Sequence, residues 1–123
     1  MTPAPHTIQR TASLADAHRM MRELGVRHLP VMTGNKLSGV VTQRDLYLLE
    51  TLADFDIEKV DVGEAMTENP FIVTGDTALD EVLEIMTAQK YGSCLVVGRD
   101  GIEGIFTTND ACRILATLLQ RAA

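Results

Sequence analysis

The sequence is internally duplicated. Aligned with itself at an offset of 65 residues, the 123-residue chain matches from Met1 to Ala53 without a gap. A unit of about 55 to 60 residues is below the size at which one core is comfortably stable, so we expect the copies to pack face to face. We predict a first unit at 1–53, a linker with a short helical turn at 54–65 and a second unit at 66–123. The identical pairs are Met1/Met66, Thr2/Thr67, Pro5/Pro70, Leu14/Leu79, Met21/Met86, Val31/Val96, Gly39/Gly104, Thr42/Thr107 and Asp45/Asp110.

Composition excludes several classes of protein. The chain is 46% hydrophobic and 23% charged, which is typical of a compact soluble domain. Its net charge of −6 argues against nucleic acid as a partner. Cys94 and Cys112 lack metal-ligand spacing, so we expect two buried thiols and no metal. Since no apolar run approaches about 18 residues and no signal-peptide pattern opens the chain, we expect a cytoplasmic protein without membrane contact.

The first copy predicts a strand, a helix, a hairpin and a second helix. Ser13 is a fitting N-cap with Asp16 three residues later, and Gly25 is a fitting helix stop. The apolar runs 29–32 and 37–41 flank turn residues, and helical spacing returns after Thr42, with Leu46, Leu49, Leu52 and Ala53 on one face.

The second copy repeats this scheme. It predicts a strand at 71–74, a helix at 78–90, strands at 93–97 and 102–106 and a helix at 108–121. The acidic segment 54–61 predicts a linker, followed by a helical turn at 62–66. We therefore predict an α/β (α+β) protein made of two β-α-β-β-α units.

Each copy ends its last strand with the pattern G-φ-φ-T-x-x-D, where φ is apolar. The pattern covers residues 39–45 and 104–110. Gly39 and Gly104 permit close backbone approach, and Thr42 and Thr107 stand where strand gives way to helix. A capping box alone can account for the Thr and Asp in one copy.

Two copies in one register resemble the CBS-domain family, over essentially the whole chain. The resemblance rests on 14–17 (Leu-Ala-Asp-Ala), 28–31 (His-Leu-Pro-Val), 37–42 (Leu-Ser-Gly-Val-Val-Thr) and 44–45 (Arg-Asp), with a weaker second copy. It implies a pair with pseudo-two-fold symmetry whose clefts bind AMP, ADP, ATP or S-adenosylmethionine. Members usually have a helical turn before Met-Thr, as at 62–65, which the first copy lacks. The protein is therefore either short or part of a longer chain.

The resemblance also implies roles for individual residues. The carboxylates of Asp45 and Asp110 would accept hydrogen bonds from ribose hydroxyls, and the hydroxyls of Thr42 and Thr107 would bond a phosphate. The motif glycines belong to the same ligand sites. The base would lie against apolar walls, for which the candidates are Ile8, Val26, Val73 and Tyr91.

Charge predicts that the two sites differ. Residues 1–53 carry six basic and four acidic side chains, a net of +2, whereas residues 54–123 carry five and thirteen, a net of −8. Arg27, His28 and Arg44 flank the first cleft, and Gly92 and Ser93 replace the first two of these in the second copy. The first site should therefore favour a charged nucleotide, with the second empty or holding a less charged adenosine derivative.

We expect a regulatory adenosine-nucleotide sensor and not an enzyme, because no nucleotide-hydrolysing, metalloprotease or nucleophile-elbow motif is present. The helices near 43–53 and 108–121 carry more apolar residues than one core can cover, which predicts a homodimer through them. An unidentified protein would be regulated. The alternatives are a ligand-free structural dimerisation module and slow nucleotide hydrolysis.

Overall fold

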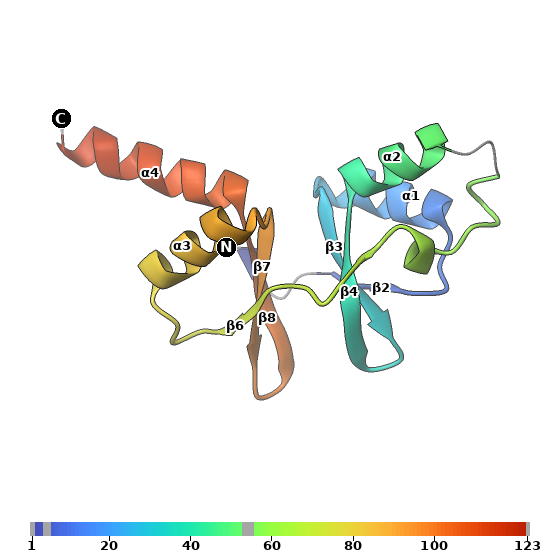
Figure 1. Ribbon diagram of the computed structural model, residues 1–123, viewed down its shortest axis with the longest axis horizontal. Coiled ribbons are helices and arrows are strands. Elements are labelled where there is room, and N and C mark those ends of the chain that lie inside the picture. Colours follow the sequence, from blue (N-terminus) through green and yellow to red (C-terminus); the bar gives the residue numbers. More distant parts are fainter. Residues whose placement is uncertain (1, 4–5, 53–55, 123) are drawn as a thin grey trace. The chain divides into compact units, whose positions relative to one another are not determined.

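The computed structural model describes residues 2–3, 6–52 and 56–122 (Figure 1). Contacts divide the chain into two units, one of residues 6–70 and the other of residues 1–5 together with 71–123. Each unit contains a four-stranded sheet and two α-helices. This confirms the predicted mixed α and β fold, with the strand, helix, strand, strand, helix order in both repeats.

The unit of residues 6–70 is built around the sheet β2-β3-β4-β5. Its elements are β2 (Ile8–Gln9), α1 (Leu14–Leu24), β3 (His28–Thr33), β4 (Lys36–Thr42), α2 (Gln43–Leu52), the 3₁₀ turn η1 (Val62–Glu64) and β5 (Thr67–Glu68). β2 runs parallel to β3, and the other neighbours are antiparallel. The two helices, η1 and one face of the sheet share a hydrophobic core that includes Leu14, Val31, Leu46 and Val62.

The second unit has the sheet order β1-β8-β7-β6. Its elements are β1 (Thr2–Pro3), β6 (Ile72–Thr74), α3 (Leu79–Gln89), β7 (Ser93–Gly98), β8 (Gly101–Thr107) and α4 (Thr108–Ala122). β6 is parallel to β7, as β2 is to β3. Val82 and Met86 of α3 pack against Cys94 and Phe106 of the sheet.

Helix α1 forms where its capping signals predict it. Ser13 Oγ accepts the Asp16 N–H at 3.0 Å, and the Asp16 carboxylate accepts the Ser13 N–H. That backbone hydrogen bond is the main reason why the pKa of Asp16 lies below its ordinary value of 3.8. The helix ends at Gly25, whose φ of 66° is left-handed. Leu14, Ala17 and Met21 then form the buried face.

Two short strands were not predicted, and each joins the sheet of the unit that contains the other repeat. β5 from the start of the second repeat pairs with β4, and β1 from the start of the first repeat pairs with β8. Gly39 allows the first of these pairings, because a Cβ there would lie 2.3 Å from the Thr67 carbonyl oxygen. The motif glycine thus admits a neighbouring strand, which is one form of the predicted close approach.

The predicted linker packs against α1 along its described part. The Val60 carbonyl accepts the Leu14 N–H at 2.9 Å, and the Ile57 carbonyl accepts the Ala15 N–H at 3.1 Å. The predicted helical turn follows as η1.

One prediction about burial is wrong. Cys112 is exposed, because Asp110 is the buried residue of α4 and a side chain two positions later points to the opposite side of the helix. Cys94 is buried as predicted. Leu52 is 74% exposed, so the buried face of α2 does not reach its end, and Ala53 lies outside the described residues. In the described part of the chain, no helix has the length and apolar character needed to cross a membrane.

Candidate ligand-binding site

In the unit of residues 6–70, the candidate site begins where β4 becomes α2. Thr42 ends the strand and Asp45 lies in the first turn of the helix. Asp45 Oδ2 accepts the Thr42 N–H at 3.0 Å, and Thr42 Oγ1 accepts the Asp45 N–H at 3.0 Å. The predicted capping box is therefore present, and its hydroxyl and carboxylate lie side by side at a helix N-terminus.

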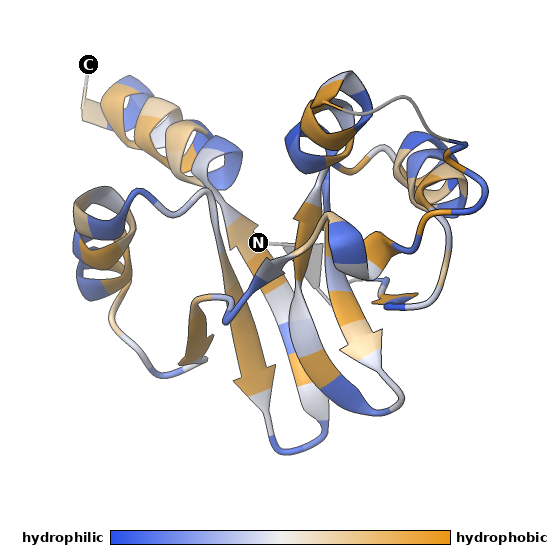
Figure 2. Ribbon diagram, turned by 45° about the vertical axis from the view of Figure 1, so that its right-hand side comes forward, coloured by the Kyte–Doolittle hydropathy of each residue, from blue (hydrophilic) through white to orange (hydrophobic). Residues whose placement is uncertain are grey.

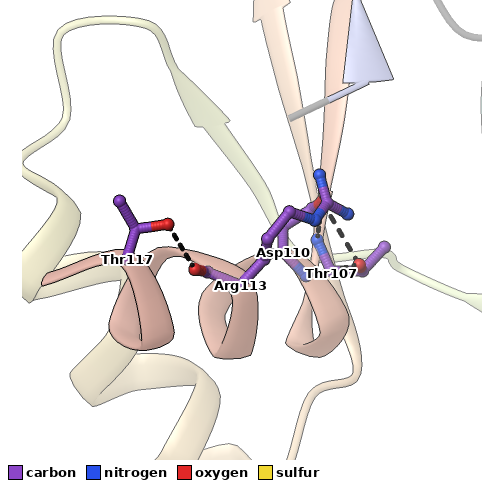
Figure 3. Close-up of polar contacts among 4 residues, drawn as sticks. All are labelled: Thr107, Asp110, Arg113 and Thr117. Atoms are coloured by element: carbon purple, nitrogen blue, oxygen red, sulfur yellow. Dashed lines mark hydrogen bonds and ion pairs between the residues drawn. The ribbon is translucent and has the colours of Figure 1, made fainter. Parts of the chain in front are cut away.

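The second unit repeats this arrangement where β8 becomes α4. Asp110 Oδ2 accepts the Thr107 N–H at 2.8 Å and the Thr107 hydroxyl at 3.2 Å, and Thr107 Oγ1 accepts the Asp110 N–H at 3.2 Å. Asp110 is only 5% exposed. Its other oxygen accepts a hydrogen bond from Arg113 Nη2 at 3.0 Å (Figure 3).

Residues at the start of β3 lie beside the start of α2. The Arg27 carbonyl accepts the Gln43 N–H at 2.9 Å, and His28 is the strand partner of Thr42. Arg44 is exposed in the first turn of α2. Arg27, His28, Thr42, Arg44 and Asp45 therefore gather at one end of this sheet.

In the second unit, the same positions bring less charge to the start of α4. The Gly92 carbonyl accepts the Thr108 N–H at 3.1 Å, and Ser93 is the strand partner of Thr107. Gly92 and Ser93 thus occupy the places of Arg27 and His28 without their side-chain charge. The geometry is shared between the repeats, and the cationic groups differ.

The other predicted residues of the first repeat lie further along the sheet. Ile8 of β2, Val31 of β3 and Gly39 of β4 are successive strand partners. Gly39 is three residues from Thr42, which is about 10 Å along a strand. Ile8 is 4% exposed and belongs to the core, and Val26 packs against that core. Ile8 and Gly39 thus lie away from the residues at the helix start, whereas Val26 directly precedes Arg27 at that end of the sheet.

The wall candidates of the second repeat include an aromatic pair. Val73 and Gly104 are both strand partners of Val96, and Val73 packs against the local core. The Tyr91 ring stacks on the Phe71 ring with 5.1 Å between their centroids, and Tyr91 is 39% exposed. The corresponding residues of the first repeat are Val26 and His6, which cannot form such a stack.

Sequence reasoning missed Phe71 and Arg113. The i,i+3 spacing of Asp110 and Arg113 on one helix could have indicated their ion pair. No local pattern joins Phe71 to Tyr91, because the two lie 20 residues apart and meet only through the fold. Among the described residues, no group of three or more His, Cys, Asp or Glu side chains is placed to hold a metal ion.

Two curated proteins are similar in sequence to most of this chain. An inosine-5'-monophosphate dehydrogenase from Korarchaeum cryptofilum is 34% identical over 105 residues, which are 85% of this chain and 21% of the dehydrogenase. The uncharacterized protein YlbB from Bacillus subtilis is 34% identical over 92 residues, which are 73% of this chain and 62% of YlbB. The chain therefore spans less than two thirds of either relative.

Solved structures share the fold. A protein named for acetoin utilization (AcuB) from Vibrio cholerae is 36% identical with a TM-score of 0.81, covering 98% of this chain and 89% of that one. The structure of CBSX2 in complex with AMP is 28% identical with a TM-score of 0.74, covering 96% of this chain and 93% of that one.

The sequence model of the CBS domain family matches residues 1–49 and 62–117. The two matched segments contain the Thr42–Asp45 and Thr107–Asp110 helix starts, one in each repeat. The chain belongs to the CBS-domain family and is a tandem CBS pair.

Proposed function

We propose that this protein is a regulatory module that binds an adenosine-containing ligand of the AMP, ADP or ATP class. The observation that carries the proposal is the repeated Thr-x-x-Asp geometry, with a hydroxyl and a carboxylate together at the start of both α2 and α4. A chain that is similar over 96% of this one, CBSX2, has been solved in complex with AMP.

The groups at the start of α2 suit a nucleotide. Of the described residues, only Thr42 hydrogen-bonds the Asp45 carboxylate, which leaves Asp45 Oδ1 to accept ribose hydroxyls. Thr42 Oγ1 accepts the cap hydrogen bond, so its own proton remains available to a phosphate oxygen. Arg27, His28 and Arg44 would add positive charge near that phosphate.

The adenine base would lie against the apolar residues of each unit. Val26 is the partly buried wall candidate of the first unit, and Tyr91 offers an exposed aromatic ring in the second. Stacking on a ring suits the flat face of adenine. Ile8 and Val73 would shape the walls from within the two sheets, and Gly39 and Gly104 would keep the neighbouring strand backbone close.

Thermal unfolding with added ligand tests the proposal. AMP, ADP, ATP and S-adenosylmethionine are each added, with GTP as a guanine control. A ligand at about 100 times its dissociation constant stabilises the folded state by roughly 2.7 kcal/mol, which gives a visible rise in Tm. Asp45→Asn and Asp110→Asn keep an acceptor oxygen for the cap, so a loss of the ligand-induced rise reports on binding.

The outcomes separate the rival functions. A rise with an adenosine ligand but not with GTP, reduced in either Asn variant, supports a sensor. The absence of any rise favours a ligand-free structural dimerisation module, in which the capping boxes serve only the helices. ATP that remains intact after prolonged incubation contradicts slow hydrolysis and fits our view that the module performs no chemistry on its ligand.

We further propose that the protein is a homodimer through α2 and α4. The exposed apolar residues of α4 include Leu115, Leu118 and Leu119, which are 56%, 54% and 62% exposed, and hydrophobic bands follow that helix in Figure 2. Tyr47 and Leu48 of α2 are 54% and 58% exposed. Apolar faces of this extent are a liability unless another surface covers them.

Regulation requires a partner. A ligand changes an equilibrium only by its difference in affinity between two conformations, so binding must be coupled to a second protein surface or domain. The chain covers only 21% of the dehydrogenase it resembles, which fits a role as an accessory module.

A further inference from the structure

The two Asp carboxylates of the repeated motif differ in their free acceptor capacity. Asp110 uses Oδ2 for Thr107 and Oδ1 for the Arg113 guanidinium, 3.0 Å away (Figure 3). The Asp110 side chain is 7% exposed and that of Arg113 is 66% exposed. The ion pair therefore covers a largely buried carboxylate with a side chain that reaches in from solvent.

The first repeat has no equivalent of this cation. The position that corresponds to Arg113 is Leu48, at the same distance of three residues from Asp45. Leu48 is 58% exposed and cannot donate a hydrogen bond. Within the described part of the chain, no basic side chain forms an ion pair with Asp45.

A ribose diol and a guanidinium would both donate hydrogen bonds to the outer carboxylate oxygen of the motif Asp. Hydroxyl groups of a ribose would donate to the outer carboxylate oxygen, since the inner one serves the helix cap. No described residue hydrogen-bonds that oxygen of Asp45, whereas at Asp110 it accepts a charge-assisted hydrogen bond from Arg113. A ligand at Asp110 would therefore compete with Arg113 for this oxygen.

We propose that Arg113 is a specificity-determining residue that weakens the Asp110 site for nucleosides, so that the Asp45 site fills first. This inference rests on the proposed function, because it presumes that ribose binds both carboxylates. Leu48 is the complementary determinant that keeps the first site open. An unequal pair of sites allows the protein to respond over a wider range of ligand concentration than two equal sites would.

Isothermal titration of the full chain tests this inference, with one site removed at a time. Asp45→Asn leaves the Asp110 site to be measured, with and without Arg113→Leu. Asp110→Asn leaves the Asp45 site, with and without Leu48→Arg. Adenosine is the main probe because it has a ribose but no phosphate, and AMP is the second. Arg121→Leu is the matched control, since it removes the same charge from an exposed position on α4.

We expect opposite changes at the two sites. Arg113→Leu should strengthen adenosine binding at the Asp110 site about fivefold, and Leu48→Arg should weaken it at the Asp45 site about fivefold, as about 1 kcal/mol for a partly exposed ion pair implies. Arg121→Leu should change neither. Melting curves from circular dichroism confirm that each variant is folded, and the Leu48→Arg arm is independent of any variant in α4.

The titrations distinguish a failure of the proposed function from a failure of the role proposed for Arg113. If the native chain and both Asn variants bind neither adenosine nor AMP, the proposed function is wrong and the role of Arg113 with it. If they bind, but Arg113→Leu leaves adenosine affinity at the Asp110 site unchanged or lower, only the role of Arg113 is wrong. If Arg113→Leu lowered the affinity for AMP but not for adenosine, Arg113 would be a phosphate contact, and the inference would likewise be overturned.

Discussion

At the scale of single residues, Cys94 and Cys112 have opposite surroundings. Cys94 is buried in the core beside Val82, Met86 and Phe106, and this burial raises its pKa from 9.0 to about 11. The raised pKa means that the neutral thiol stabilises the fold below pH 9, and that this contribution is lost as pH rises through about 11. Cys112 is exposed on α4.

We therefore predict that one thiol of the native protein reacts with iodoacetamide at pH 8 and the other does not. The thiolate is the nucleophile, and Cys94 is both covered and protonated at that pH. Mass spectrometry of the native protein should find label on Cys112 alone, and the protein unfolded in urea should carry label on both. Rapid native labelling of Cys94 would contradict its placement in the core.

At the scale of elements, the first helices of the two repeats begin differently. Ser13 caps α1 with a reciprocal capping box, whereas Ala78 stands at the N-cap of α3 and provides no side-chain hydrogen bond. Ala78 has φ −62° and ψ 135°, an extended conformation like that of Ser13. Glu81, three residues later, occupies the position from which a capping box makes its reverse hydrogen bond.

Ala78→Ser should therefore stabilise the protein, and Ser13→Ala should destabilise it, each by about 1 kcal/mol. The midpoint of urea unfolding measured by circular dichroism gives both values. The two substitutions are matched because they exchange the cap residues of equivalent helices. A loss of stability in Ala78→Ser would show that packing near α3 outweighs the cap.

Gly39 controls the pairing of β5 with β4. A Cβ at Gly39 would lie 2.3 Å from the Thr67 carbonyl oxygen, a backbone atom, so β5 must shift in Gly39→Ala. Overpacking of this kind costs about 1–3 kcal/mol. At Gly75 a Cβ would be 3.6 Å from its nearest neighbour, a side-chain oxygen of Glu103, so Gly75→Ala is the control.

Urea unfolding should thus separate the two glycine variants. Gly39→Ala should lower the midpoint, and hydrogen exchange at Thr67 and Glu68 should become faster as their strand pairing is lost. Gly75→Ala should change the stability by less than about 1 kcal/mol. Equal stability of both variants would contradict the close approach of β5.

At the scale of the whole molecule, the proposed dimer depends on the exposed leucines of α4. We predict that the native protein sediments as a dimer and that Leu118→Glu weakens dimerisation at least about tenfold, because an unpaired carboxylate would be buried in the interface. Gln120→Glu is the control, since it adds the same charge to the face of α4 that carries Arg113 and Thr117. Analytical ultracentrifugation over a range of concentrations measures both. A native protein that remains monomeric would refute the proposed dimer.

Sequence patterns alone predicted the duplication, the fold class and most helices and strands. Those features depend on local signals: the cap at Ser13, the stop at Gly25 and the turn residues between paired apolar runs act within a few residues of each other. The Thr-x-x-Asp contacts were also local, because Thr42 and Asp45 are only three residues apart.

The contacts between elements that are remote in sequence could not be predicted and depend on the folded chain. β1 and β5 are two residues long, and their partners β8 and β4 are remote in sequence, so no local pattern marks them. The stack of Phe71 on Tyr91 and the packing of residues 57 and 60 at the start of α1 likewise depend on where the chain returns. Burial of Asp110 beneath Arg113 follows from the same cause, since a sequence shows spacing along a helix but not the side of that helix which the fold covers.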